Sequence, residues 1–434
     1  FTASRNTLDN KATKYYRNIE TPENLLYDYR SQEIENKFRI DRNLMIKEVQ
    51  ISFGTNFNFA TYKNNSTSKN VTQNAVNFDN LDVNLNVMQY GIYVQAAKKF
   101  FDNKIQISAG TRFDASNYSD KTNNPLEQFS PRLSLSYRFA PQFSFIFSTG
   151  IFSQLPSYTA LGFSGNGQFT NRENLKYIRN THFVGGLEFN GKDNLRITME
   201  GYYKKYRNYP FSLRNQISIA NIGGDFGVVG NEPLDSRGSG ETYGFEVLAQ
   251  KRTLNNFYGI AAYTFGYSKF SNLSGNLIAS SWDSRHILTL TTGKYFKRNW
   301  NIGARFRLQS GLPETPYDLQ RSSLVNIWNI ANGPLKDFTY INTLRGNLSH
   351  QLDVRAEKRW IFKKWQLFAY VDVVNIYGSE SPSNLPVVNL QRDGANNGII
   401  ANPTAPQDQQ YYLLDVGTAE RTTPLSYFGL IFEF

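Results

Sequence analysis

The last eleven residues of this chain alternate strictly between two kinds of side chain, and this constrains the fold more than any other feature. Residues 424–434 read Pro-Leu-Ser-Tyr-Phe-Gly-Leu-Ile-Phe-Glu-Phe, so that Phe428, Leu430, Phe432 and Phe434 share one face of an extended strand. In a soluble protein, a chain ending in such a strand would present an apolar edge with unpaired backbone groups. A closed barrel removes that edge, and its apolar face can meet lipid. The segment therefore predicts a strand of a transmembrane β-barrel.

Composition agrees with strands that have one lipid-facing and one water-facing side. Phenylalanine and tyrosine supply most of an aromatic fraction of 15%, yet the mean hydropathy is negative. The sequence has no apolar run of about 18 residues, the length that a membrane helix needs. It also has no cysteine, which excludes disulfides and thiolate metal sites and suits passage through an oxidising compartment. The net charge of +11 favours either an anionic ligand or simply a solvated, lysine-rich surface.

Strand patterns recur from about residue 33 to the end, and we find no amphipathic helix of normal length. The sequence predicts an all-β fold with about fifteen strands. They are expected at 33–42, 46–62, 84–100, 104–117, 130–139, 143–153, 175–189, 194–208, 239–252, 256–270, 283–296, 299–310, 349–361, 365–377 and 424–434.

Short and long connections alternate between these expected strands. Short turns include Asp102-Asn103, Pro141-Gln142 and Lys297-Arg298. The long polar segments are 63–83, 118–129, 154–174, 209–238, 271–282, 311–348 and 378–423. Outer-membrane barrels have this arrangement, with short periplasmic turns and long outer loops. We therefore expect residues 1–32 to form an extracellular loop segment and residues 33–434 to form barrel strands.

Alternation within the strands separates charged side chains from apolar ones. Because a lysine or arginine on the lipid face costs about 2–4 kcal/mol at the bilayer midplane, these charges should face a polar lumen. The candidate lumen-facing residues are Arg132, Arg138, Glu200, Glu246, Arg305, Arg307, Asp353, Arg355 and Glu357. They would guide a polar solute, or pair with one another, or hold a plug.

Fifteen strands cannot close a bacterial single-chain barrel, which has an even number of antiparallel strands. The simplest interpretation is that the chain is the C-terminal part of a larger barrel.

Several segments resemble those of the TonB-dependent outer-membrane receptors of Gram-negative bacteria. Tyr90-Gly-Ile-Tyr-Val-Gln95 and Ile107-Ser-Ala-Gly-Thr-Arg-Phe-Asp114 resemble one barrel hairpin of this family, and Ser130-Pro-Arg-Leu133 with Gly150-Ile-Phe-Ser-Gln-Leu-Pro-Ser157 resemble the next. Later matches are Tyr243-Gly-Phe-Glu246, Asp283-Ser-Arg-His286, Ser310-Gly-Leu-Pro313 and Asp372-Val-Val-Asn375. The resemblance covers roughly residues 84–434.

The resemblance implies active import of a scarce, bulky nutrient by a multi-pass protein of the bacterial outer membrane. In this family a barrel of 22 strands surrounds a plug; the plug and roughly seven strands have no counterpart here. The implied partners are that N-terminal portion, the TonB complex that acts through it, outer-membrane lipid and a possible surface lipoprotein on the long loops. The resemblance also makes Phe428, Phe432 and Phe434 a C-terminal assembly signal.

Catalytic and metal-binding patterns are absent from the sequence. His182, His286 and His350 lie far apart and lack companions at ligand spacing. Asp393-Gly394 does not fit the twelve-residue calcium loop. No basic element with interleaved aromatics suggests nucleic-acid binding. We expect no enzyme activity, no cofactor and no metal.

Two alternatives stay open beside active uptake. A passive porin would close with 16–18 strands around an open channel, and an adhesin-type barrel would use the long loops for attachment. An outer-membrane enzyme would need a catalytic dyad or triad that the sequence does not offer. The transported nutrient, whether siderophore, haem, vitamin, glycan or peptide, is not predicted.

Overall fold

The computed structural model describes residues 1–71, 76–165, 167–223, 229–254, 256–419 and 421–434. The regular structure of this part of the chain is mostly antiparallel β-structure, with a few short helices, which confirms the predicted all-β class. None of its helices is both long and apolar enough to span a membrane.

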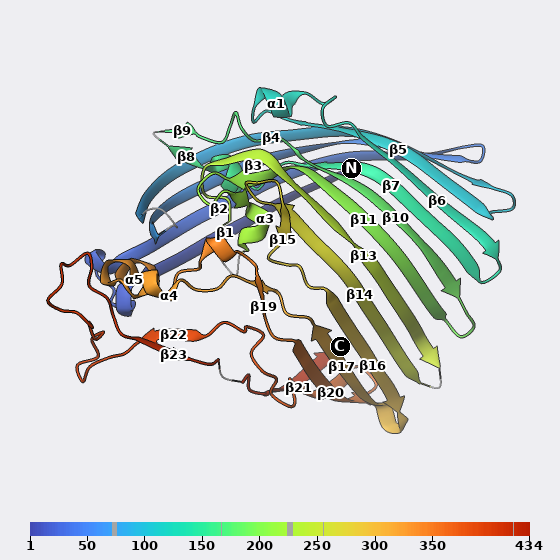
Figure 1. The fold of residues 1–434 in the computed structure, drawn as a ribbon. Helices are drawn as coiled ribbons and strands as arrows, with labels where there is room; N and C mark the ends of the chain where they lie inside the picture. The colour runs from blue at the N-terminus through green and yellow to red at the C-terminus, as the bar shows by residue number, and fades with distance from the viewer. Residues whose placement is uncertain (72–75, 166, 224–228, 255, 420) are drawn as a thin grey trace.

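One large, curved sheet dominates the molecule (Figure 1). Within the described residues, sixteen strands of nine or more residues follow one another as an antiparallel meander. They are β1 (Thr2–Tyr15), β2 (Leu25–Ile46), β3 (Val49–Val71), β4 (Val76–Phe100), β5 (Ile105–Ser116), β6 (Ser130–Ala140), β7 (Phe143–Gln154), β10 (Ile178–Asn190), β11 (Leu195–Ser212), β13 (Leu234–Leu254), β14 (Phe257–Ser271), β16 (His286–Phe296), β17 (Trp300–Gln309), β20 (Ser349–Ile361), β21 (Gln366–Val374) and β24 (Leu425–Glu433).

Short elements lie in the connections. The short strands are β8 (Ser164–Gly165), β9 (Gln168–Phe169), β12 (Ile217–Ser218), β15 (Leu277–Ala279), β18 (Pro313–Glu314), β19 (Leu344–Arg345), β22 (Val387–Leu390) and β23 (Leu414–Gly417). The helices are α1 (Asp120–Asn123), α2 (Tyr158–Gly162), α3 (Ile219–Ile222), α4 (Leu319–Ser323) and α5 (Val325–Ala331). Single 3₁₀ turns are η1 (Tyr16–Asn18), η2 (Pro22–Asn24), η3 (Lys297–Asn299) and η4 (Phe338–Tyr340).

Apart from the connection between β3 and β4, the short connections lie at one end of the strands, because two antiparallel strands separate each of them from the next. Several turn on residues with a positive φ, such as Asp102 and Asn103 (52° and 64°) or Asp193 and Asn194 (56° and 58°). Asparagine and aspartate tolerate this left-handed conformation better than most residues. The expected alternation of short and long connections is therefore present, with one exception at residues 63–83, where β3 and β4 continue as strands.

The prediction that residues 1–32 form a loop is wrong for most of that segment. Thr2–Tyr15 is a strand that pairs with β2 in a register from Thr2↔Arg39 to Tyr15↔Leu25. Its sequence, TASRNTLDNKATKY, has no alternating apolar residues, so backbone hydrogen bonds to β2 hold it in place. This strand raises the count from the expected fifteen to sixteen.

The sheet is open within the described residues. The first strand, β1, pairs only with β2, and the last, β24, pairs only with β21. The long loops nevertheless cross from the late strands to the early ones: α5 packs against β3, and Arg17 Nη1 donates a hydrogen bond to Asn397 Oδ1 at 3.1 Å. The expected closure with 22 strands around a plug stays a prediction.

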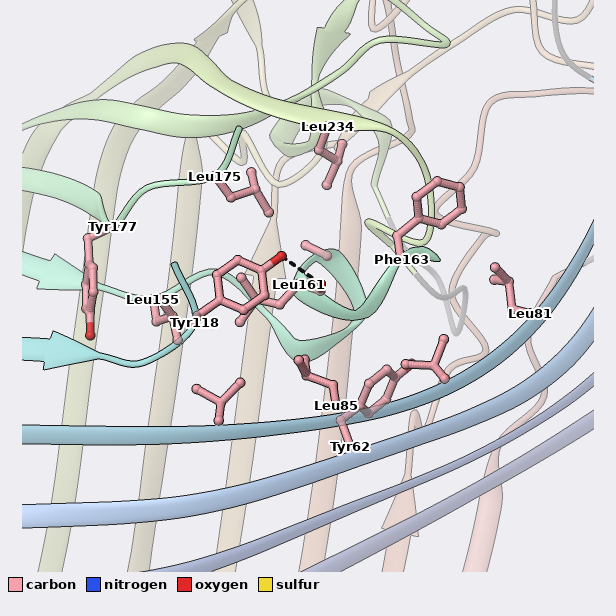
Figure 2. Packing of buried hydrophobic residues seen from close by; sticks show 13 residues of the cluster. Tyr62, Leu81, Leu85, Tyr118, Leu155, Leu161, Phe163, Leu175, Tyr177 and Leu234 are labelled. Carbon is pink, nitrogen blue, oxygen red and sulfur yellow. Dashed lines mark hydrogen bonds between the residues drawn. The ribbon is translucent and has the colours of Figure 1, made fainter. Parts of the chain in front are cut away.

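Two faces of the sheet differ in what they contact. We call the face that the long loops cover the inner face, and the opposite one the outer face. Tyr62 and Leu85 lie directly opposite each other on the inner face of β3 and β4, where they pack with Leu161, Leu175 and Leu234 from the loops (Figure 2). Exposed apolar side chains, by contrast, gather on the outer face of the strands; they include Phe57, Ile92, Leu133, Phe183, Met199, Ile302 and Phe428.

Candidate ligand-binding site

A large cavity lies between the inner face and the loops that cover it. Its volume is about 1570 Å³, above the usual 300–1,000 Å³ of small-molecule pockets. Its walls come from the strand ends next to the long loops, those of β1 and β2 on one side and of β7, β10, β11 and β14 on the other. Residues from 155–159, in α2 and in the loop before it, complete the lining. A ligand there would touch several strands and a loop at once.

Aromatic side chains form one wall of this cavity. Tyr209 near the end of β11 lies with its ring centre 4.6 Å from that of Phe270 on β14. Tyr206 is 5.2 Å and Trp282 6.0 Å from the same phenylalanine ring. Phe270 fits against β13 because Gly240 has no side chain at the point of contact. The four rings offer flat apolar surface of the kind that stacks on planar groups.

A second wall combines one aromatic ring with nitrogen-bearing side chains. Phe152 projects from β7 between Arg132 on β6 and His182 on β10. The Arg132 guanidinium carbon lies 4.3 Å from the centre of the Phe152 ring, and the His182 ring centre lies 4.4 Å from it. Lys204 on β11 is directly opposite His182. Phe152 and His182 line both this cavity and a smaller one of about 480 Å³ that also contains Arg132.

Two cations lie beside this second wall but outside the lining of the large cavity: Arg132 lines the smaller cavity, and Lys204 lies next to His182. Within the described residues neither Arg132 nor Lys204 forms an ion pair, whereas nearby Arg112 pairs with Asp114. The Nε2 atom of His182 is buried and has no hydrogen-bond partner among these residues. A cation held by an aromatic contact and lacking a carboxylate partner favours an anionic group in the smaller cavity that Arg132 lines.

Tyr158 in α2 fixes the loop that covers the cavity. Its hydroxyl donates to Glu35 Oε1 at 2.8 Å and accepts from Asn58 Nδ2 at 3.3 Å and Gln89 Nε2 at 3.2 Å. Burial, followed by the contact with Glu35, raises the pKa of Tyr158 above its usual range. The neutral phenol therefore stays a donor to Glu35 over the physiological pH range. Tyr118 adds a second attachment, donating from its hydroxyl to the Leu161 carbonyl oxygen at 2.8 Å (Figure 2).

The strand register places all nine predicted lumen residues on the inner face, since residues directly opposite in neighbouring strands share a face. Of these, five pair with carboxylates or cations on that face: Arg305 with Asp353 at 2.9 Å, Arg307 with Asp353 at 3.7 Å, and Arg355 with Glu357 at 2.8 Å. This register does not by itself make the inner face a lumen.

The other four predicted residues lack ion pairs within the described part of the chain. Arg132 contacts Phe152, and Arg138 donates to the Asn103 carbonyl oxygen at 3.4 Å near a short turn. Glu200 and Glu246 lie directly opposite each other on β11 and β13. Like charges in this position repel each other, and neither carboxylate forms an ion pair among the described residues.

The terminal phenylalanines occupy the outer face of β24. Phe428 is 79% and Phe434 99% exposed, and Phe432 lies directly opposite Leu367 on β21. Their role in assembly stays a prediction.

Sequence reasoning missed the cavity itself. Phe152, Tyr206, Tyr209, Phe270 and Trp282 were not predicted as site residues, and His182 was set aside for want of companions. Their common signal is an aromatic or histidine residue near the loop end of a strand.

The described residues contain no cluster of His, Cys, Asp or Glu suited to a metal ion. In the Asp393-Gly394 loop, which does not fit the calcium pattern, Asp393 Oδ1 accepts backbone hydrogen bonds from Ala395 and Asn397 at 2.9 and 2.8 Å.

Comparisons with solved structures agree with this architecture. The pyoverdine receptor FpvA of Pseudomonas aeruginosa, in complex with a heterologous pyoverdine and iron, matches with a TM-score of 0.60 and 14% identity, over 89% of this chain and 50% of the receptor. The copper transporter OprC matches with a TM-score of 0.61 and 13% identity, over 99% and 61%. The ferric-catecholate import receptor Fiu of E. coli K12 matches with a TM-score of 0.58 and 12% identity, over 99% and 61%.

At these identities the similarity concerns the fold alone, and the chain spans about half to three-fifths of the length of these structures. No curated protein sequence matches the chain. The family model described as TonB dependent receptor-like, beta-barrel matches residues 1–390, which is most of the chain. The chain therefore belongs to the β-barrel family of the TonB-dependent receptors.

Proposed function

We propose that this chain is the C-terminal barrel portion of an active transporter that imports a scarce, bulky nutrient across the bacterial outer membrane. The observation that carries the proposal is the 1570 Å³ cavity on the inner face, which is enclosed by loops and lined by four clustered aromatic rings. Phe152 and His182 line both this cavity and the smaller one beside it, where Arg132 lies. A nutrient captured there would lie on the route from the outside to the lumen. The transporter has no enzymatic step and no resident cofactor.

The plug of the complete transporter is the proposed partner of the carboxylate pair Glu200 and Glu246. The two side chains face each other on the inner face without a cation among the described residues. A charge enclosed by a plug must be paired, since an uncompensated buried charge is strongly destabilising. Basic groups of the plug would supply the pairing, and the TonB complex would act through the plug to release the nutrient into the periplasm. A surface lipoprotein on the long loops is a further candidate partner.

The cavity favours a ligand that combines planar rings with an anionic group. Aromatic side chains stack on planar groups, while Arg132 and Lys204 attract negative charge. Catecholate siderophores and haem have both properties; neutral glycans have neither. The solved structures with a similar fold include a pyoverdine receptor and a ferric-catecholate import receptor. Iron chelates are therefore the first class to test.

The experiment is uptake by cells that express the complete gene as their only receptor of this type. A panel of iron chelates, haem, cobalamin, oligosaccharides and peptides is offered to matched cells with and without TonB. We expect one class to accumulate only when TonB is present. The alternative is a passive porin or an adhesin barrel. Equal uptake in the two strains would favour the porin, and no uptake of any class by cells that adhere to surfaces would favour the adhesin.

A further inference from the structure

A third cavity, which we call the polar chamber, lies on the inner face beside the large cavity. Its volume is about 710 Å³, within the usual range of small-molecule pockets. Its lining comes from β2, β3, β4, β5 and β7, from residues 155–158 and from Tyr177. Residues 153–157 also line the large cavity, so this segment is a partition between the two spaces. The chamber can therefore hold a group of its own.

The cations of the polar chamber are neutralised within the chain. Every lysine and arginine of its lining has a carboxylate partner; the pairs are Lys37–Glu35 at 2.6 Å, Arg39–Asp41 at 2.7 Å and Arg112–Asp114 at 2.5 Å. Glu33 also lines the chamber and forms no ion pair within the described residues. The chamber therefore has no free cation for an anionic ligand, in contrast to the neighbouring cavity that Arg132 lines.

Tyr177 brings to the chamber a hydroxyl that has no partner. The residue lies at the edge of the apolar cluster just before β10, and only 4% of its surface is exposed (Figure 2). Asn208 Nδ2 donates to its backbone carbonyl oxygen at 3.2 Å, but its hydroxyl forms no hydrogen bond within the described residues. Burial, and after it the charge of Asp114, raises the pKa of Tyr177, so the hydroxyl stays a donor. An unmet buried donor costs stability, and a carbonyl oxygen in the chamber would satisfy it.

Amide side chains of the chamber add both an acceptor and a donor. Gln89 donates through Nε2 to the Tyr158 hydroxyl at 3.2 Å, and its side-chain oxygen accepts no hydrogen bond from the described residues. Asn56 accepts from Arg112 through Oδ1, which leaves its Nδ2 atom as a donor. A peptide group likewise carries one N–H donor and one carbonyl acceptor. The chamber thus matches the hydrogen-bonding pattern of an amide.

The chamber offers no open aromatic face to a planar ligand. The ring of Tyr158 stacks on Tyr62, with 6.5 Å between their centres, and Tyr177 is buried in the apolar cluster. Phe38 and Phe57 lie opposite each other on the outer face of β2 and β3. Planar rings prefer an exposed aromatic surface on which to stack. They find one in the large cavity and not here.

We propose that the polar chamber is a second binding site of this chain, selective for an uncharged, amide-bearing chain such as a short stretch of peptide backbone. The Tyr177 hydroxyl donates to a carbonyl oxygen of this ligand, and the side-chain oxygen of Gln89 accepts from one of its N–H groups. The site does not depend on the ligand of the large cavity, and the inference does not rest on transport.

The test is equilibrium dialysis of the complete protein in detergent against isotopically labelled N-acetyl-triglycine amide, a capped peptide without side chains or charge. We expect saturable binding that Tyr177→Phe weakens about fivefold, the effect of one lost hydrogen bond. Tyr90→Phe is the matched control. Tyr90 also borders the chamber, but its hydroxyl donates to Asn123 Oδ1 at 2.6 Å, so its removal should leave peptide binding unchanged.

A second probe tests the ligand without changing the protein. An analogue in which the central amide is replaced by an ester lacks one N–H, and we expect it to bind about fivefold more weakly. No saturable binding of the capped peptide, equal affinity for the ester, or equal weakening by Tyr177→Phe and Tyr90→Phe would each overturn the proposal. Failure of TonB-dependent uptake for every nutrient class would overturn the transport proposal alone, because peptide binding is measured without transport.

Discussion

At the scale of single residues, the contact of Phe152 with Arg132 and His182 places a cation beside the proposed ligand site. The ring provides a face for the Arg132 guanidinium at 4.3 Å and a neighbour for the His182 imidazole at 4.4 Å. An arginine held by an aromatic ring keeps its charge available to a ligand, whereas Arg305 and Arg355 are already neutralised by carboxylates. The inner face therefore has structural and ligand-directed arginines side by side.

Replacing Arg132 should weaken binding of the imported ligand. We expect Arg132→Gln and Phe152→Leu each to lower its affinity about tenfold, because a desolvated cation–π contact and the charge that it positions are worth about 1–2 kcal/mol. Equilibrium binding of the ligand found in the uptake panel measures this. Arg138→Gln is the matched control, since Arg138 shares the face but lies beside a short turn; an equal loss in the control would count against a local site.

Tyr158 should control how firmly the α2 loop covers the cavity. Tyr158→Phe removes three hydrogen bonds to Glu35, Asn58 and Gln89, each worth about 1 kcal/mol net. We expect amide hydrogen exchange in residues 157–162 to accelerate tenfold or more. Tyr177→Phe is the control, because the Tyr177 hydroxyl forms no hydrogen bond within the described residues; unchanged exchange in Tyr158→Phe would contradict the anchoring role.

At the scale of strands, alternation predicted some elements and failed for others for physical reasons. The strand β20 shows its pattern in sequence because Leu352, Val354 and Ala356 alternate with charged residues. The strand β1 has no such pattern, and its pairing with β2 rests on the backbone ladder. The polar segment 63–83 was expected to be a loop, but β3 and β4 continue through its described residues. Their buried inner residues, such as Leu81 and Val83, pack against loop residues that are distant in the sequence, so the local pattern does not show the strands.

The outer face of β17 and β20 should reject charge. Phe306 and Leu352 lie directly opposite each other there, and a lysine on a lipid-facing position costs about 2–4 kcal/mol near the bilayer midplane. We expect Phe306→Lys to lower the amount of folded protein in the membrane severalfold, as shown by heat-modifiable migration in gels. Ser134→Lys, on the inner face of β6, should insert normally. Equal insertion of both variants would contradict the assignment of the faces.

The end of β24 should matter for assembly more than for binding. Phe434 is 99% exposed on the outer face, so its removal breaks few contacts within the chain. We expect deletion of Phe434, or Phe434→Asp, to reduce the surface level of the protein while the molecules that do assemble keep normal ligand affinity. Quantitative surface labelling, combined with binding per assembled molecule, checks this. Normal surface levels would argue against an assembly signal.

At the scale of the whole molecule, the fold class followed from the sequence, whereas the cavity did not. Period-two alternation and the spacing of turns are local, so they identify strands and their faces. The cavity joins side chains that lie far apart in the sequence, such as Tyr29 on β2 and Trp282 in the connection after β14. Only the curvature of the sheet and the inward folding of the loops bring them together, and neither is encoded in a short stretch of sequence.

The most direct test of the account is cysteine labelling of the two faces in intact outer membranes. The chain has no cysteine of its own, so single substitutions report cleanly. We predict that Thr289→Cys and Ser134→Cys, on the inner face, react with a membrane-impermeant, water-soluble maleimide, whereas Phe306→Cys and Leu352→Cys react only with a lipid-soluble reagent. Equal reaction of all four positions with the water-soluble reagent, or the reverse pattern, would contradict a barrel wall with a polar lumen and a lipid-facing exterior.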